Sequence, residues 1–157
     1  MHRGESCGWR DVTKPPWRSP DPQASAVAGD YPWHTLAQYD AGGWHSSTYA
    51  GEPLPTLEAL ARWCLANGHH LNIEIKPTPG SERATGEAVA IEAARLWANA
   101  AVPPLLTSFK TDALEGAKSQ APHLPRGLLL NSLWEGWFEQ AQALGCVAVV
   151  CQYGLWD

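Results

Sequence analysis

The segment "LNIEIKP" (71–77) contains a carboxylate, Glu74, and an ammonium group, Lys76, with one residue between them. Side chains alternate along a strand, so Glu74 and Lys76 share one face of the strand that this segment predicts. Pro77 has no N–H to donate to a sheet and ends the strand, which puts both charges at its C-terminal end. Active sites of β/α proteins assemble at that end. The pair is therefore either part of a site or a solvated Glu–Lys pair on an edge strand.

The opposite face of this predicted strand, over residues 71–76, is aliphatic. Leu71, Ile73 and Ile75 alternate with Asn72 and the two charged residues. The aliphatic face suits packing against helices, whereas charges on the polar face are costly to bury without partners. We therefore expect helices to cover one face of this strand.

The elements around this strand alternate regularly from Thr56 onward. Thr56 is suited to cap a helix that ends at Asn67-Gly68. A second helix is predicted from Ser81 or Thr85 to about Asn99. The remaining chain predicts helices and strands in alternation, with strands over 103–109, 126–130 and 146–151 and helices over 111–120 and 133–144.

Short apolar strands that alternate with helices predict an α/β fold with a parallel sheet and right-handed crossovers. Four strands of this kind form either a small open sheet or about four βα units of a (β/α)8 barrel, which takes ~250 residues. The sequence ends in "VCQYGLWD" directly after a predicted strand, which favours a partial barrel.

The composition predicts a globular protein. The chain has 157 residues, of which 45% are hydrophobic and 17% charged. A net charge of -5 without a basic block argues against nucleic acid as the main partner. No apolar run approaches the ~20 residues of a membrane span, and the N-terminus has no signal-peptide pattern, so we expect a cytoplasmic protein. Residues 1–25 are predicted to be a disordered segment before a domain over 26–157.

The cysteines and tryptophans have ordinary structural interpretations. Cys7, Cys64, Cys146 and Cys151 show neither a C-x-x-C motif nor a His at zinc spacing, which predicts reduced core cysteines. The nine tryptophans suit either a sugar-stacking surface or packing within the predicted helices.

Four segments, in this order, resemble the glycerophosphodiester phosphodiesterases, in particular the bacterial cytoplasmic glycerophosphoryl diester phosphodiesterases. They are "LAQYDAGGWHSSTYAGEPLPTLEAL", "LNIEIKP", "PPLLTSFKTDALEGAKSQAPHLPRGLLL" and "LGCVAVVCQYGLWD", and together the resemblance covers about residues 26–157. It implies a (β/α)8 barrel enzyme, a phosphoric diester hydrolase that releases glycerol 3-phosphate and an alcohol. It also implies a divalent cation, Mg2+ or Ca2+.

The resemblance assigns roles to the charged pair. Glu74 matches the metal-ligand Glu of the family's N-I-E-I-K strand, and Lys76 matches the Lys beside the scissile phosphate. Hard cations bind carboxylate oxygens, and a fixed ammonium stabilises charge that builds on a phosphate in the transition state. These roles favour a site over a solvated pair.

The sequence also departs from the family. P-E-N-T, E-x-D and H-D motifs have no counterpart, so the first two and last two strands of the barrel are not matched. His2-Arg3-Gly4 spells the family's H-R-G but follows only Met1, and we interpret it as a chance match; a shifted reading frame in residues 3–25 is the second explanation. The chain matches one metal ligand of the family and neither acid/base His. We therefore predict that the chain alone has little activity, since each lost acid/base group lowers the rate roughly 10²–10⁴-fold.

Several alternatives stay open. The chain is a phosphodiesterase, an inactive remnant of one, or a Trp-rich sugar- or headgroup-binding module. Its expected partner is a small glycerophosphodiester, and open sheet edges would favour self-association. Asp40 and Glu52 are interpreted as turn and cap residues, and Ser108 as a residue at the rim of the site.

Overall fold

The structure of the chain is a computed structural model, which describes residues 28–155. The described chain divides into two compact units between Pro55 and Thr56. The predictions for residues 1–25, including His2-Arg3-Gly4 and Cys7, lie outside the described residues. The predicted domain boundary at residue 26 therefore stays a prediction.

The first unit is rich in turns, as its Gly and Pro residues predict. Asp40 forms an isolated antiparallel bridge with Pro53. Its Oδ1 accepts hydrogen bonds from the backbone N–H groups of Gly42 and Gly43, at 2.9 and 2.8 Å, which confirms Asp40 as a turn residue. Three short helices are present in its described part: η1 (Ala28–Asp30), α1 (Trp33–Leu36) and η2 (Ser47–Tyr49).

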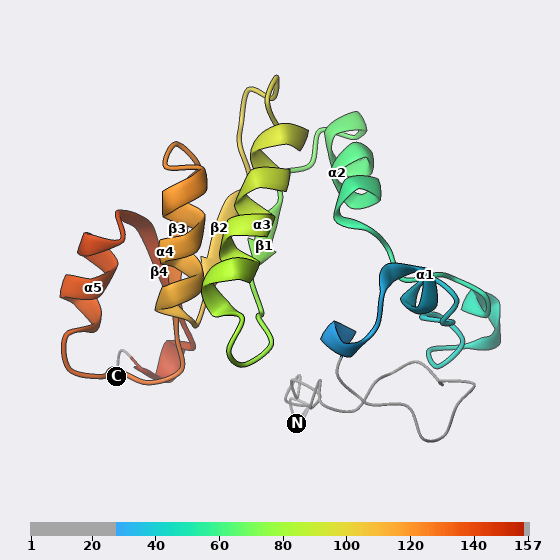
Figure 1. Ribbon diagram of the computed structural model, residues 1–157, viewed down its shortest axis with the longest axis horizontal. Helices are drawn as coiled ribbons and strands as arrows, with labels where there is room; N and C mark the ends of the chain where they lie inside the picture. Colours follow the sequence, from blue (N-terminus) through green and yellow to red (C-terminus); the bar gives the residue numbers. More distant parts are fainter. Residues whose placement is uncertain (1–27, 156–157) are drawn as a thin grey trace, which may run out of the picture. The chain divides into compact units, whose positions relative to one another are not determined.

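The second unit is a four-stranded parallel sheet in the order β1-β2-β3-β4, with a helix between successive strands (Figure 1). The predicted α/β alternation is therefore correct. In chain order the elements are α2 (Leu57–Ala66), β1 (Asn72–Glu74), α3 (Glu82–Leu96), β2 (Leu105–Ser108), α4 (Thr111–Gln120), β3 (Arg126–Leu130), α5 (Trp137–Ala143), β4 (Cys146–Cys151) and η3 (Tyr153–Leu155).

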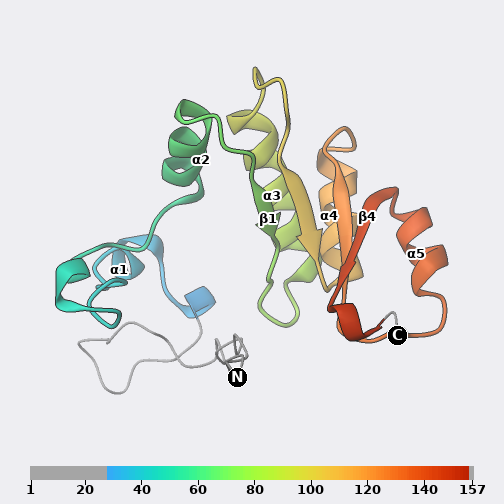
Figure 2. The same cartoon turned by 180° about the vertical axis from the view of Figure 1, so that it is seen from behind.

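Helices α3, α4 and α5 lie on one face of this sheet, and Figure 2 shows the strands from the other side. On the covered face, Ile75 and Leu106 pack with alanines of α3 and α4. A second cluster on the same face joins Leu128 and Leu130 of β3 to Leu144 after α5. Ile75 is 2% exposed, so the prediction that helices cover the aliphatic face of the first strand is confirmed.

The face without a described helix, which we call the open face, carries the alternate side chains. Glu74 is level with Thr107 in the sheet, Thr107 with Gly127, and Gly127 with Ala148. A Cβ on Gly127 would lie 3.1 Å from the Thr107 methyl and 3.6 Å from the Ala148 Cβ, so these positions face the same side. The open face consists of Asn72, Glu74, Leu105, Thr107, Gly127, Leu129, Ala148 and Val150.

Some element bounds differ from the prediction, each for a local reason. β1 is three residues long, although backbone pairing with β2 continues on both sides through the Leu71 carbonyl and the Ile75 N–H. β2 starts at Leu105 rather than residue 103, because Pro103 and Pro104 have no N–H to donate. α5 starts at Trp137 rather than residue 133, because Gly136 has a left-handed φ of 83°.

The starts of α2 and α3 agree with the prediction. Thr56 caps α2, because its hydroxyl accepts a hydrogen bond from the N–H of Ala59 at 3.0 Å. α3 follows Ser81 and ends at Leu96 rather than near Asn99. Between Ala28 and Leu155, the helices are too short or too polar to cross a bilayer.

Candidate active site

Glu74 and Lys76 lie together at the C-terminal end of β1. Glu74 is the last residue of the strand, and both side chains are exposed. Between them, the N–H of Ile75 donates a 2.6 Å hydrogen bond to the carbonyl oxygen of Thr107, which extends the pairing by one residue. Since the Ile75 side chain is buried on the covered face, the pleat directs its two neighbours toward the open face. The face of Glu74 agrees with the alternation in the sequence, and the shared role of Glu74 and Lys76 stays a prediction.

A buried threonine supports the open face beside Glu74. Thr107 is level with Glu74 on β2 and is fully buried. Its hydroxyl donates a 3.0 Å hydrogen bond to Oδ1 of Asn72. Gly127 on the next strand leaves room for its methyl group. Thr107 was not among the predicted site residues, and the local signal for it is a polar residue within the apolar segment "PPLLTSF".

Ser108 does not line the rim of the site, and that expectation is wrong. It is fully buried on the covered face, because it alternates with Thr107 along β2. Its hydroxyl donates to the carbonyl oxygen of Ile75 at 2.7 Å and accepts from the N–H of Lys110 at 3.0 Å. Ser108 therefore positions the backbone that carries the charged pair.

The described residues do not form a complete metal site. Among residues 28–155, no three His, Cys, Asp or Glu side chains come close enough to hold a metal ion. Mg2+ and Ca2+ normally combine several oxygen ligands, and Glu74 supplies one carboxylate. The residues present therefore do not fit Mg2+ or Ca2+ without further ligands, and we derive no catalytic step through a metal.

The described cysteines are core thiols, as predicted. Cys64 is buried, and Cys146 and Cys151 are half-buried against the apolar cluster around α5. Burial raises the pKa of the Cys146 thiol, although the charges of Arg126 and Lys118 oppose this shift. Cys146 is therefore not an activated nucleophile at neutral pH.

The tryptophans are divided between the interior and the surface. Trp97 is 5% exposed, and Trp137 packs against the cluster around α5. Trp63 is 58% exposed and lies against His69, with ring centroids 5.0 Å apart. The other described tryptophans are exposed, Trp33 in α1 and the other two in loops: Trp44 and Trp134. Trp9, Trp17 and Trp156 lie outside the described residues, and sugar binding by these side chains stays untested.

The four parallel strands and intervening helices, with a charged pair at a C-terminal strand end, define a partial β/α-barrel protein. The chain matches the model of the glycerophosphoryl diester phosphodiesterase family over residues 11–155. It belongs to this family, as the resemblance predicted.

A solved structure agrees with this assignment. A phosphodiesterase of Oleispira antarctica, in complex with the product sn-glycerol-3-phosphate, is 28% identical to the chain and superposes with a TM-score of 0.73. The match covers 83% of the chain and 53% of the Oleispira protein. The chain thus spans about half the length of this relative, and the predicted partial barrel is confirmed. A comparison with curated proteins gives no match.

Proposed function

We propose that the chain binds glycerophosphodiesters for hydrolysis to glycerol 3-phosphate and an alcohol. Lys76 would contact the phosphate, and Glu74 would supply one oxygen ligand to Mg2+ or Ca2+. What supports this proposal is the position of Glu74 at the C-terminal end of β1, with an exposed Lys76 two residues further along the chain, in a member of a phosphodiesterase family.

The geometry suits recognition of a phosphate group. The Lys76 side chain is exposed, so an anion from solvent can reach it. Two hydrogen bonds hold the backbone at Ile75, one to Thr107 and one from Ser108. A positioned ammonium stabilises negative charge on a phosphate without reorganising during the reaction.

Turnover by residues 1–157 alone is expected to be slow. Among residues 28–155, Glu74 belongs to no group of three possible metal ligands, and Mg2+ normally combines several oxygen ligands. The relative bound to sn-glycerol-3-phosphate is about twice as long, since the match covers 53% of it. Fast metal-dependent release of glycerol 3-phosphate from glycerophosphocholine, abolished by Glu74→Gln, would contradict this expectation of low activity.

Calorimetric titration with sn-glycerol 3-phosphate tests the binding proposal. We expect Lys76→Met to weaken binding about tenfold or more, because a charge-assisted contact is lost. Lys118→Met is the matched control, since Lys118 lies on α4 and donates to the carbonyl oxygen of Ala143 on the covered side. Equal affinity of the wild type and Lys76→Met would overturn the proposal.

A further inference from the structure

Both edges of the parallel sheet lack a strand partner among residues 28–155. β1 pairs only with β2, and β4 pairs only with β3. An unpaired edge presents backbone N–H and C=O groups that can pair with another chain. A register shift at Arg126/Gly127 displaces Val147, so regular pairing of β4 covers residues 148–151. This length is comparable to the three residues of β1.

Apolar side chains are exposed at the β4 edge and on the helix that precedes β1 in the chain. At the β4 edge, Val150 is 45% exposed on the open face, and Phe138 of the neighbouring α5 is 52% exposed. On α2, which immediately precedes β1 in the chain, Leu60 and Trp63 are 42% and 58% exposed. Exposed apolar groups that accompany an unpaired edge favour a protein partner.

The arrangement of the strands identifies a partner that fits. All four strands run in the same direction, so rotating a second copy by half a turn about a barrel axis keeps every strand parallel. That rotation brings β4 of each copy beside β1 of the other and forms two equivalent junctions. The product has eight strands, the number for which side chains fill the interior of a barrel.

We propose that the chain of residues 1–157 pairs with a second copy of itself to close an eight-stranded barrel through two β4–β1 contacts. The open face becomes the barrel interior, which removes Val150 from water. Glu74 and Lys76 of both copies then lie at the same end of one barrel. The inference does not depend on the proposed function, because its measurements are mass and amide protection.

Sedimentation of the purified chain, from low to high micromolar concentration, measures the assembly directly. The mass should double and then remain constant. A monomer at every concentration would overturn the proposal, and so would a mass that rises beyond two copies, since the contacts would then form an open array.

A charge placed inside the proposed barrel tests its geometry. Val150→Lys puts an ammonium on the open face of an edge strand and should weaken dimerisation about tenfold or more. Ile91→Lys is the matched control, because Ile91 is 53% exposed on α3, which covers the other face. Equal weakening by the two variants would contradict closure through the open face.

Hydrogen exchange of the wild-type chain tests the contact without any substitution. When concentration rises through the dimerisation range, amides of residues 72–74 and 148–151 should slow together, about tenfold or more. Amides of the central strand β3 should not change to that extent. Protection of β4 alone would indicate β4–β4 pairing and overturn the proposal. Protection of both edges in a chain that stays monomeric would show that its own residues cover them, which also overturns it.

Discussion

The hydroxyl of Ser108 donates a 2.7 Å hydrogen bond to the carbonyl oxygen of Ile75, and it thereby joins the end of β2 to the end of β1. Ser108 is fully buried. Because Glu74 and Lys76 are the two neighbours of Ile75 in sequence, this bond fixes the backbone between the charged groups. A residue on the covered face thus controls the geometry of the open face.

Replacing this serine should destabilise the sheet. Ser108→Ala leaves the Ile75 carbonyl and the Lys110 N–H without their partner, so the free energy of unfolding should fall by about 1–3 kcal/mol in urea denaturation. Ser119→Ala is the control, because the Ser119 hydroxyl donates to the Gly116 carbonyl at 2.7 Å on the surface of α4. Its effect should stay within about 0.5 kcal/mol. Equal losses would show that the buried bond has no special role.

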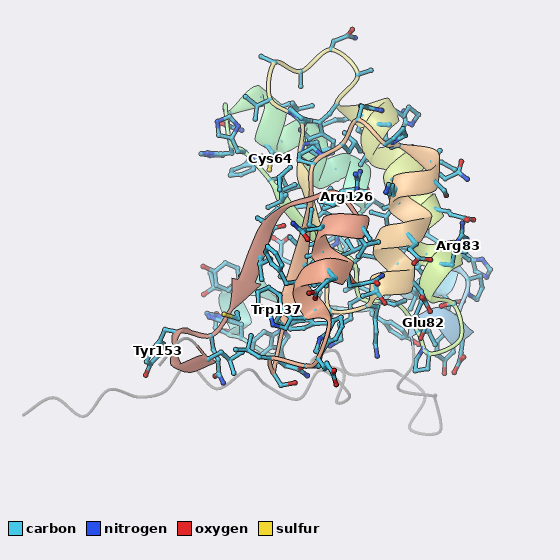
Figure 3. All side chains as sticks on the ribbon, turned by 90° about the vertical axis from the view of Figure 1, so that its left-hand side faces the viewer. Cys64, Glu82, Arg83, Arg126, Trp137 and Tyr153 are labelled. Atoms are coloured by element: carbon cyan, nitrogen blue, oxygen red, sulfur yellow. The ribbon has the colours of Figure 1, made fainter. Side chains whose placement is uncertain are left out.

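A buried arginine connects the loop after α4 to the C-terminal end of α5. Arg126, labelled in Figure 3, is 5% exposed and donates to the carbonyl oxygens of Leu144, Pro122 and Leu124 at 3.1, 3.2 and 2.7 Å. Arg126→Met leaves these carbonyls without a donor and should lower the free energy of unfolding by at least about 2 kcal/mol.

An exposed arginine provides the comparison for this prediction. Arg62 has a side chain that is 76% exposed and forms an ion pair with Glu58 within α2. Arg62→Met should therefore change the unfolding free energy by no more than about 0.5 kcal/mol in the same denaturation experiment. An equally small change in the unfolding free energy of Arg126→Met would contradict the prediction, because the carbonyl groups that Arg126 binds would then have found other donors.

Helices α3 and α4 pack closely at a glycine from each helix. A Cβ on Gly86 would overlap the backbone carbonyl of Ala113, and one on Gly116 would overlap that of Arg83. Gly86→Ala should lower the free energy of unfolding by about 1–3 kcal/mol, because backbone atoms of the two helices must move apart. This loss should exceed the gain from the better helix propensity of alanine. Gly154→Ala, where no atom lies within 4 Å, should be nearly neutral in a thermal melt. A more stable Gly86→Ala variant would contradict this close packing.

The turn around Asp40 should be sensitive to acid. Hydrogen bonds from the backbone of Gly43, Gly51 and Gly42 lower the pKa of the Asp40 carboxyl below its ordinary value of 3.8. These bonds favour the ionised form, so their contribution to stability is complete above the ordinary pKa and is lost as pH falls through the lower folded pKa. In an NMR titration, the amide signals of Gly42 and Gly43 should move with a midpoint below 3.8, and Asp40→Asn should abolish this step. A midpoint at or above 3.8 would contradict the assignment.

Local sequence patterns were sufficient for much of the fold. The predicted bounds of α4, β3 and β4 agree with the structure, because each is a short apolar or amphipathic run between clear stops such as Pro122 and Gly145. Alternation along "LNIEIKP" also placed Glu74 on the open face. The start of α5 was missed because the left-handed backbone of Gly136 interrupts an otherwise helical pattern.

The supporting contacts of the site could not be predicted in the same way. Thr107 and Asn72 are 35 residues apart, and Ser108 and Ile75 are 33 apart. Such pairs meet only when two strands are placed in register, and no pattern within one segment indicates that register. Ser108 shares a face with Leu106, and the apolar segment around them did not show which face of the strand the helices cover.

The most direct test of the account is to map where sn-glycerol 3-phosphate binds. We would titrate the isotope-labelled chain and follow its backbone amide signals by NMR. We expect the largest shifts at residues 72–76 and 107–110, and we expect Lys76→Met to remove them. An alternative place is the groove between α3, α4 and α5, whose lining includes Arg83, Glu115 and Lys118. Shifts confined to that groove, or unchanged by Lys76→Met, would contradict a phosphate site at the end of β1.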